Sequence, residues 1–301
     1  MKPSIGRASG KKHVQEMCDQ RRRSVHQDFA LVTAMAWLLM LSGAFHLLWL
    51  LLTQSEWEGP LSLRKPALFG LSGGLTLWSI AWVLTKLPTH RLDRSFAMSM
   101  GVGLLLEVGQ ITVQQWRGVA SHFNHTTAVD AAIEATMLLL ITFVSLGITW
   151  LAVRSLWLTS TDAATRVAIQ GGLWLLVVSC LLGFAITFAG EWNASTGKSP
   201  ELWGRAGVMK YPHGAALHAI QLLPLLAYCS TWLPVNSRAT LLRATLASQF
   251  LLLGSAIWQT VLGRSRFDLD IVGGSLLLGS VLLMVYVAFE IAVGLSRIKR
   301  I

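Results

Sequence analysis

The stretch Phe96–Trp116, FAMSMGVGLLLEVGQITVQQW, decides the fold of this chain. It is long and apolar enough for a helix that crosses a membrane, which needs about 20 residues. Four polar residues in it and just after it are spaced so that they lie on one helix face: Glu107, Gln110, Gln114 and Arg117. An ionisable side chain in the hydrocarbon core is costly unless it faces protein or a water-filled cavity. We therefore expect this polar face to point into a bundle of helices.

The composition of the whole chain is that of a protein with several membrane spans. Of the 301 residues, 53% are hydrophobic and 13% are charged, and the mean hydropathy is +0.55. The net charge of +10 comes from basic residues that flank the apolar runs, where they set topology and contact anionic lipid. No nucleic-acid-binding motif accompanies them. The sequence therefore predicts the lipid bilayer as a partner and no nucleic acid.

Eight apolar segments follow one another along the chain, each long enough to span a membrane as a helix. They lie at about 29–53, 66–87, 96–116, 128–153, 168–190, 213–233, 243–262 and 271–293. We expect an all-α integral membrane protein with eight transmembrane helices. The expected parts are a basic N-terminal tail (1–28), a first four-helix unit (29–153), a linker (154–167), a second four-helix unit (168–293) and a C-terminal tail (294–301).

The positions of the basic residues predict the orientation of this bundle. If the N-terminus is inside, most of the 25 lysines and arginines fall on the inner side, as the positive-inside rule requires. An even number of spans places both termini on that side. We expect a bacterial cytoplasmic (inner) membrane protein with both termini cytoplasmic and the loop 191–212 outside.

Two parts of the chain carry similar marker residues in the same order. The markers are Pro66 and Gln114-x-x-x-Gly118 in the first part, and Pro212 and Gln259-x-x-x-Gly263 in the second. With four helices in each unit, a duplication would give two halves of the same orientation, which is a parallel repeat. Chance agreement explains the spacing equally well, so the sequence leaves the repeat open.

Almost all polar residues of the predicted spans fall in their outer halves. Besides the face on the third span, they include Lys65 at the start of the second, Asp130 in the fourth, and His218 and Gln221 in the sixth. This asymmetry predicts a cup that opens to the outside. We expect Glu107, His122, His218 and Gln221 to approach one another there, with the third and sixth spans as neighbours.

Residue chemistry gives these side chains candidate roles. Glu107, Asp130, His122 and His218 are candidate catalytic residues, because carboxyl and imidazole groups transfer protons. The candidate cofactor-binding residues are Lys65, Gln110, Gln114, Arg117, Asn124 and Gln221. His122, His125 and His218 are candidate metal ligands, and haem ligation from separate helices is also physically allowed. Since no HExxH, CxxC or CxxCH motif is present, haem, a divalent metal and quinone all stay open as cofactors.

Three stretches carry a resemblance to known proteins. They are Lys65-Pro66-x-x-Phe69-x-x-Ser72, Arg117-Gly118-x-x-Ser121-His122-Phe123-Asn124 and His213-x-x-x-x-His218-Ala219-x-Gln221. They resemble the signatures of a bacterial family of multi-pass membrane proteins of unassigned function, which implies that these polar residues form one site. The four-plus-four arrangement is similar to haem A synthase at the level of the fold alone. That family's paired haem-ligand histidines have no counterpart here in the second or eighth span.

The sequence leaves several functions open. The leading one is a membrane redox or cofactor-binding protein, in which Glu107 handles a proton while Lys65 and Arg117 hold an anionic group of a small molecule. The alternative is a proton-coupled transporter of a small solute, although the nearly apolar inner half argues against it. An intramembrane metal-dependent lipid hydrolase and a non-catalytic scaffold are further alternatives. Whether the protein is an enzyme, and its oligomeric state, stay open.

Overall fold

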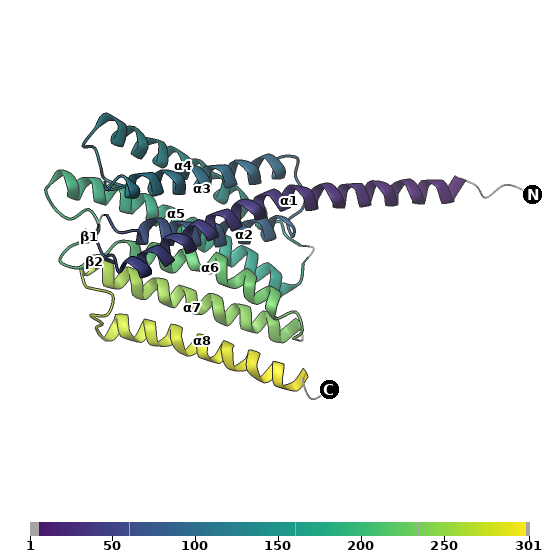
Figure 1. Cartoon of the computed structure of the whole chain (residues 1–301). Coiled ribbons are helices and arrows are strands. Elements are labelled where there is room, and N and C mark those ends of the chain that lie inside the picture. Colours follow the sequence, from purple (N-terminus) through teal and green to yellow (C-terminus); the bar gives the residue numbers. More distant parts are fainter. Residues whose placement is uncertain (1–5, 60, 160, 234, 299–301) are drawn as a thin grey trace, which may run out of the picture.

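The computed structural model describes residues 6–59, 61–159, 161–233 and 235–298, and these residues form a bundle of helices with one short hairpin (Figure 1). The helices are α1 (Gly6–Thr53), α2 (Arg64–Leu84), α3 (Asp93–Trp116), α4 (Ala128–Ser155), α5 (Ala163–Ser195), α6 (Lys210–Cys229), α7 (Val235–Val261) and α8 (Ile271–Ile298). The strands β1 (Leu202–Trp203) and β2 (Gly207–Val208) pair antiparallel between α5 and α6. Residues 6–28, which we expected as a tail, continue α1 beyond the bundle (Figure 1).

Seven of the described helices are long and apolar enough to cross a membrane, so the expectation of an all-helical, multi-pass membrane protein is confirmed. They are α1 from Phe29 onward, α2, α3, α4, α5, α7 and α8. The remaining helix, α6, has 20 residues and carries Lys210, His213, His218 and Gln221. These polar residues set α6 apart from the helices that qualify as spans by composition. Nevertheless, α6 packs inside the bundle against α2, α5 and α7.

The core lies between helices from the first and second halves of the chain, while the outer faces of the helices are apolar and exposed. Leu77, Met100, Leu173 and Ile220, from α2, α3, α5 and α6, are almost completely buried. Helix α8 packs against α7 and keeps most of its surface exposed. Exposed apolar side chains are expensive in water but not against lipid chains, so this distribution fits a bilayer.

The end of the bundle that carries the β1–β2 hairpin, here the hairpin end, holds most of the polar side chains. At this end α1, α3, α5 and α7 finish and α2, α4, α6 and α8 begin (Figure 1). Helix α8 finishes at the opposite end, which is also the end from which α1 projects (Figure 1). The hairpin is fastened to the end of α7, because Ala206 N donates to Gly263 O at 2.9 Å and Thr260 Oγ1 to Val208 O at 3.2 Å.

Candidate functional site

The structure distributes the polar residues of the hairpin end over several separate groups. The first is centred on Asp130, which is 2% exposed. Its Oδ1 accepts hydrogen bonds from Gln114 Nε2 and Arg117 Nη1, both at 2.9 Å. Its Oδ2 accepts from Thr127 Oγ1 at 2.6 Å and from Thr126 Oγ1 at 3.2 Å. These contacts fasten the end of α3 to the start of α4, so Asp130 and Gln114 have a structural role here, and their catalytic and cofactor-binding roles stay predictions.

The loop between α3 and α4 is held in one shape by a second carboxylate, that of Glu134. Phe123 has a φ of +56°, which is unusual for a residue with a side chain. The Phe123 N–H donates to Glu134 Oε1 at 2.6 Å, and the Asn124 N–H donates to Oε2 at 2.9 Å. Asn124 Nδ2 also donates to Ala120 O at 3.0 Å. The ring of Phe123 occupies the space beside Gly190 of α5, where any Cβ would collide with it.

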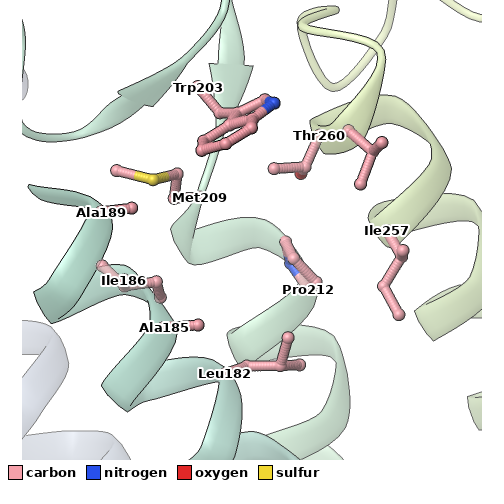
Figure 2. Close-up of a pocket in the computed structure, with 10 residues that line it drawn as sticks. Leu182, Ala185, Ile186, Ala189, Trp203, Met209, Pro212, Ile257 and Thr260 are labelled. Carbon is pink, nitrogen blue, oxygen red and sulfur yellow. The ribbon is translucent and has the colours of Figure 1, made fainter. Parts of the chain in front are cut away.

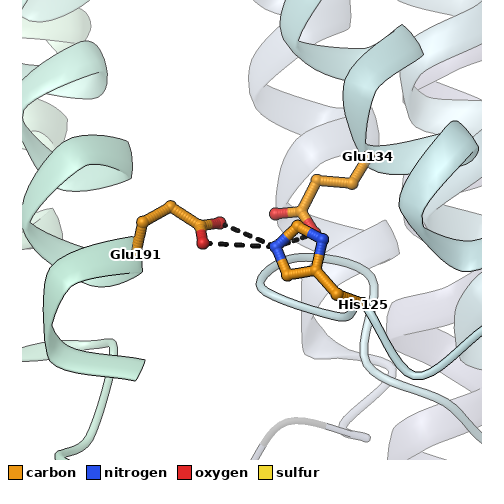
Figure 3. A group of neighbouring side chains, drawn as sticks. All are labelled: His125, Glu134 and Glu191. Carbon is orange, nitrogen blue, oxygen red and sulfur yellow. Dashed lines mark hydrogen bonds and ion pairs between the residues drawn. The ribbon is translucent and has the colours of Figure 1, made fainter. Parts of the chain in front are cut away.

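This loop places His125 between two carboxylates, one on α4 and one on α5 (Figure 3). His125 Nε2 lies 3.2 Å from Glu191 Oε2 and 3.6 Å from Glu134 Oε2. One ligand atom from each of the three residues lies within 4.8 Å of those of the other two. The His125 and Glu191 side chains are 55% and 40% exposed, against 14% for Glu134. The group is therefore a candidate metal centre that solutes can reach.

The other two expected metal ligands do not join His125. Among the described residues, His122, His125 and His218 do not form a group whose ligand atoms lie within 4.8 Å of one another. His122 Nδ1 lies 2.9 Å from Ser121 Oγ, and its ring packs against Phe69. His218 is exposed on α6, with Nδ1 2.8 Å from Gln221 Oε1. His122 and His125 share the loop between α3 and α4, but their ligand atoms and that of His218 on α6 do not converge, so the expected set of three histidines is not brought together. The group that contains His125 is completed by Glu134 and Glu191.

The polar face of α6 meets α2 and not α3. Gln221 Nε2 donates to Ser72 O and to Thr76 Oγ1, both at 3.1 Å. Helix α2 packs against both α3 and α6, whereas α3 and α6 are not themselves a closely packed pair. The expectation that the third and sixth spans are neighbours is therefore wrong, and Glu107, His122, His218 and Gln221 do not form a single pocket.

Glu107 lies inside the bundle and faces α5. It is 6% exposed, and its Oε2 has no hydrogen-bond partner among the described residues. Gln110 Oε1, one turn along α3, is likewise buried without such a partner in the described part of the chain. The Cys180 thiol of α5 lies within electrostatic range of Glu107. The expected inward direction of this helix face is thus confirmed for Glu107 and for Gln114, which is fully buried.

Two charged residues at the hairpin end, Glu201 and Lys210, were not predicted as site residues from the sequence. Glu201 Oε1 lies 2.7 Å from Lys210 Nζ and 3.5 Å from Lys65 Nζ. Burial by itself would raise the pKa of Glu201. The hydrogen bonds and positive charges of Lys210 and Lys65 outweigh this effect, so the pKa of Glu201 is lowered. Lys210 precedes Pro212 at the start of α6 much as Lys65 precedes Pro66 in α2, a signal that could have found it. Nothing in the sequence around Glu201 indicated its role.

His122 lies beside these lysines and supplies a test of the local electrostatics. Burial, together with the charges of Lys65 and Lys210, lowers the pKa of His122 from 6.5 to about 4. Between these values the unfolded chain binds a proton that the folded chain does not, so stability is lost as the pH falls from 6.5 toward 4. The loss amounts to about 3 kcal/mol at most. We expect His122→Asn, which keeps a polar atom near Ser121, to flatten this part of the stability–pH profile.

The profile is measured as the thermal unfolding midpoint of detergent-solubilised protein between pH 7 and pH 4. His90→Asn is the control, because His90 is exposed at the opposite end of the bundle. Parallel profiles for the wild type and His122→Asn would show that His122 titrates alike in the folded and unfolded chains.

An apolar groove lies under the hairpin, between α5, α6 and α7 (Figure 2). Its volume is about 240 Å³. Its lining includes Leu182 and Ile186 of α5, Pro212 of α6 and Ile257 of α7, and Trp203 of the hairpin covers it (Figure 2). None of the expected site residues lines this groove. Its chemistry suits a hydrocarbon chain and not a polar cofactor.

Comparisons with protein-family models, with curated proteins and with solved structures find no match to this chain. The resemblance of its three motifs to a bacterial family, and the analogy to haem A synthase, therefore stay predictions. The function has to be inferred from the geometry of the site.

Proposed function

We propose that this protein is a cofactor-binding membrane protein that holds a divalent metal ion at the hairpin end through His125, Glu134 and Glu191. One observation carries the proposal, namely that these three ligand atoms converge from three separate elements. One imidazole and two carboxylates suit Zn²⁺, Mn²⁺ or Fe²⁺, and with Fe²⁺ or Mn²⁺ the site would be redox-active. Quinone or haem binding, which the sequence left open, has less support from this ligand set.

The surroundings of the three ligands favour metal binding over a chance meeting of charges. The two backbone N–H groups that bond Glu134 fix the direction of its carboxylate and leave lone pairs on both oxygens. The contact of Phe123 with Gly190 brings the loop onto α5 next to Glu191. Since three protein ligands leave coordination positions open and the site is accessible, a water molecule or a substrate can complete the shell.

The first test of the metal site compares the affinities of the purified wild type and the Glu191→Gln variant for Zn²⁺ and Mn²⁺. We expect Glu191→Gln to weaken binding by at least about a hundredfold, because an amide oxygen is a far poorer ligand than a carboxylate. Isothermal titration calorimetry in a nonionic detergent measures this after chelator treatment. Bound metal should also raise the unfolding temperature of the wild type, since it binds the folded chain preferentially.

Glu56→Gln is the matched control for this experiment. Glu56 is exposed at the same end of the bundle and lies outside the metal group. We expect this variant to bind metal as the wild type does. Equal affinities of the wild type and Glu191→Gln would show that the metal does not use these ligands.

A proton-coupled transporter is the second candidate, and Glu107 is the observation that favours it. A carboxylate kept inside a membrane bundle without a partner for one oxygen is expensive, and such groups commonly carry protons or bind substrate. The buried oxygen of Gln110 on the same face extends this polar path toward the hairpin end. In the described half of the bundle away from the hairpin, most buried polar side chains are hydroxyls, such as those of Ser79, Thr245 and Ser248. Hydroxyl groups do not carry a coupling proton as a carboxylate does, which ranks transport below metal binding.

The membrane orientation and the number of spans belong to the same proposal. We place the protein in a bacterial cytoplasmic membrane, with both termini cytoplasmic and the hairpin end outside. The basic residues at the opposite end of the bundle support this orientation. The packing of α6 among three other helices supports an eighth span despite its polar residues.

A parallel duplication of two four-helix units completes the proposal. The pairs α1–α2, α2–α3, α1–α3 and α3–α4 are packed, and so are the corresponding pairs of α5 to α8. Identical residues are separated by the same number of positions in three pairs: Lys65 and Lys210, Gln114 and Gln259, and Gly118 and Gly263. Gly118 and Gly263 have φ values of +72° and +66° and end α3 and α7 in the same way. These similarities support duplication over chance.

A further inference from the structure

Two lysines, one from each four-helix unit, contact the same carboxylate oxygen at the hairpin end. Lys65 Nζ of α2 lies 3.5 Å from Glu201 Oε1, and Lys210 Nζ of α6 lies 2.7 Å from it. The Lys65 side chain is 7% exposed. One carboxylate balances only one of two ammonium charges, so this lysine pair keeps an excess positive charge, at a buried Lys65 and a partly exposed Lys210.

The neighbouring charges do not remove this excess. Arg64 and Lys210 both repel the Lys65 ammonium, and Glu201 is the acidic group that attracts it. Arg64 is itself paired with Glu58 at 2.8 Å. His122 is uncharged at neutral pH, because burial lowers its pKa to about 4. An unbalanced charge in a partly dehydrated place is costly, and a mobile anion would relieve it.

The lysine pair lies where the two units meet. Lys65 and Lys210 occupy corresponding positions at the starts of α2 and α6. Deeper in the bundle the same two helices are joined by the hydrogen bond from Gln221 Nε2 to Thr76 Oγ1 at 3.1 Å, again between corresponding positions. A ligand that contacts both lysines would therefore bridge the two four-helix units through corresponding residues of α2 and α6.

We propose that Lys65 and Lys210 bind a phosphate group, and that the Glu201 carboxylate takes its place when the phosphate is absent. With Glu201 turned away, two ammonium groups match the charge of a phosphate monoester, which is close to −2 at neutral pH. Glu201 can turn away without moving the hairpin, because only its side chain contacts the lysines. The Glu201 and Lys210 side chains are 33% and 39% exposed, so the ligand enters from the hairpin end.

The experiment measures binding of inorganic phosphate to the full-length protein in a nonionic detergent by isothermal titration calorimetry. Glu201→Gln removes the competing charge, and we expect it to raise phosphate affinity about tenfold. Lys65→Met and Lys210→Met each remove one ammonium group and should lower affinity about tenfold or more. Because Lys65 is buried and its variant could fold poorly, the exposed Lys210 provides the independent test.

Lys198→Met is the matched control, since Lys198 is an exposed lysine on the same side of the bundle. It should bind phosphate as the wild type does. A second arm compares unfolding temperatures in phosphatidylcholine nanodiscs with and without phosphatidic acid. Binding of free phosphate identifies a soluble phosphate compound as the ligand, and stabilisation by phosphatidic acid alone identifies a lipid headgroup. If neither occurs, or if Glu201→Gln brings no gain in either arm, the cluster is a structural ion pair and the proposal is overturned.

Discussion

Replacing Asp130 with leucine is expected to lower the thermal unfolding midpoint of the detergent-solubilised protein by roughly 5–10 °C. The change removes the acceptor of four side-chain hydrogen bonds and leaves Arg117 and Gln114 without it. Arg117 is 41% exposed and can turn toward water, which keeps the loss below that of a fully buried pair. Differential scanning fluorimetry or circular dichroism measures the midpoint.

The double variant Asp130→Leu with Arg117→Leu separates the effect of leaving the Arg117 guanidinium unpaired from the effect of the lost packing and hydrogen bonds of Asp130. We expect it to recover part of the lost stability, because no unpaired guanidinium is then left beside an apolar side chain. An Asp130→Leu variant as stable as the wild type would show that this network does not hold α3 to α4.

The opposite result is expected for the second buried carboxylate. Glu107→Leu should leave the unfolding midpoint unchanged or raise it by a few degrees, because it removes a buried oxygen that has no partner among the described residues. The same assay measures it, and Asp130→Leu is its comparison. A large loss of stability in Glu107→Leu would show that Glu107 is a structural group. A variant that is as stable as the wild type, or more so, would mean that Glu107 lowers the stability of the folded protein. Residues that do so are common at functional sites.

The Cys180 thiol offers a second measurement of the same position, because it lies within electrostatic range of Glu107. In a background with Cys18 and Cys229 replaced by serine, labelling of Cys180 by a water-soluble reagent reports whether water reaches this part of the bundle. A transporter requires labelling from both sides of the membrane. Labelling from neither side would remove the second candidate function.

Much of the fold was predictable because hydropathy and helical periodicity are local properties of the chain. The run Phe96–Trp116 became α3 within a few residues, and its polar face turned inward as the cost of a charge in lipid requires. The limits of α5 were less predictable. It continues to Ser195, so that Glu191 lies on a helix and faces His125.

The partners of the charged residues were not predictable from the sequence. Periodicity places Glu107 and Arg117 on one face of α3, but it does not say which neighbouring helix each of them meets. Arg117 pairs with Asp130 across a loop, whereas Lys65 pairs with Glu201 from a distant hairpin. Such pairs depend on the order of helices around the bundle, which no local pattern encodes.

The candidate metal site was only partly predictable for a similar reason. His125 was a candidate, but its two partners depend on the shape of the loop before α4. That shape requires the positive φ of Phe123 and the contact of its ring with Gly190, and both arise from tertiary packing. A helix-by-helix analysis cannot anticipate either feature.

X-ray absorption spectroscopy of the zinc-loaded protein tests the central claim, that His125, Glu134 and Glu191 hold a metal ion. We predict a first shell of nitrogen and oxygen at about 2.0–2.2 Å with the scattering of one imidazole. His125→Asn should lose the imidazole signal, and Glu56→Gln should keep it. Imidazole scattering that persists in His125→Asn, or a wild-type protein that retains no zinc after desalting, would contradict the proposed site.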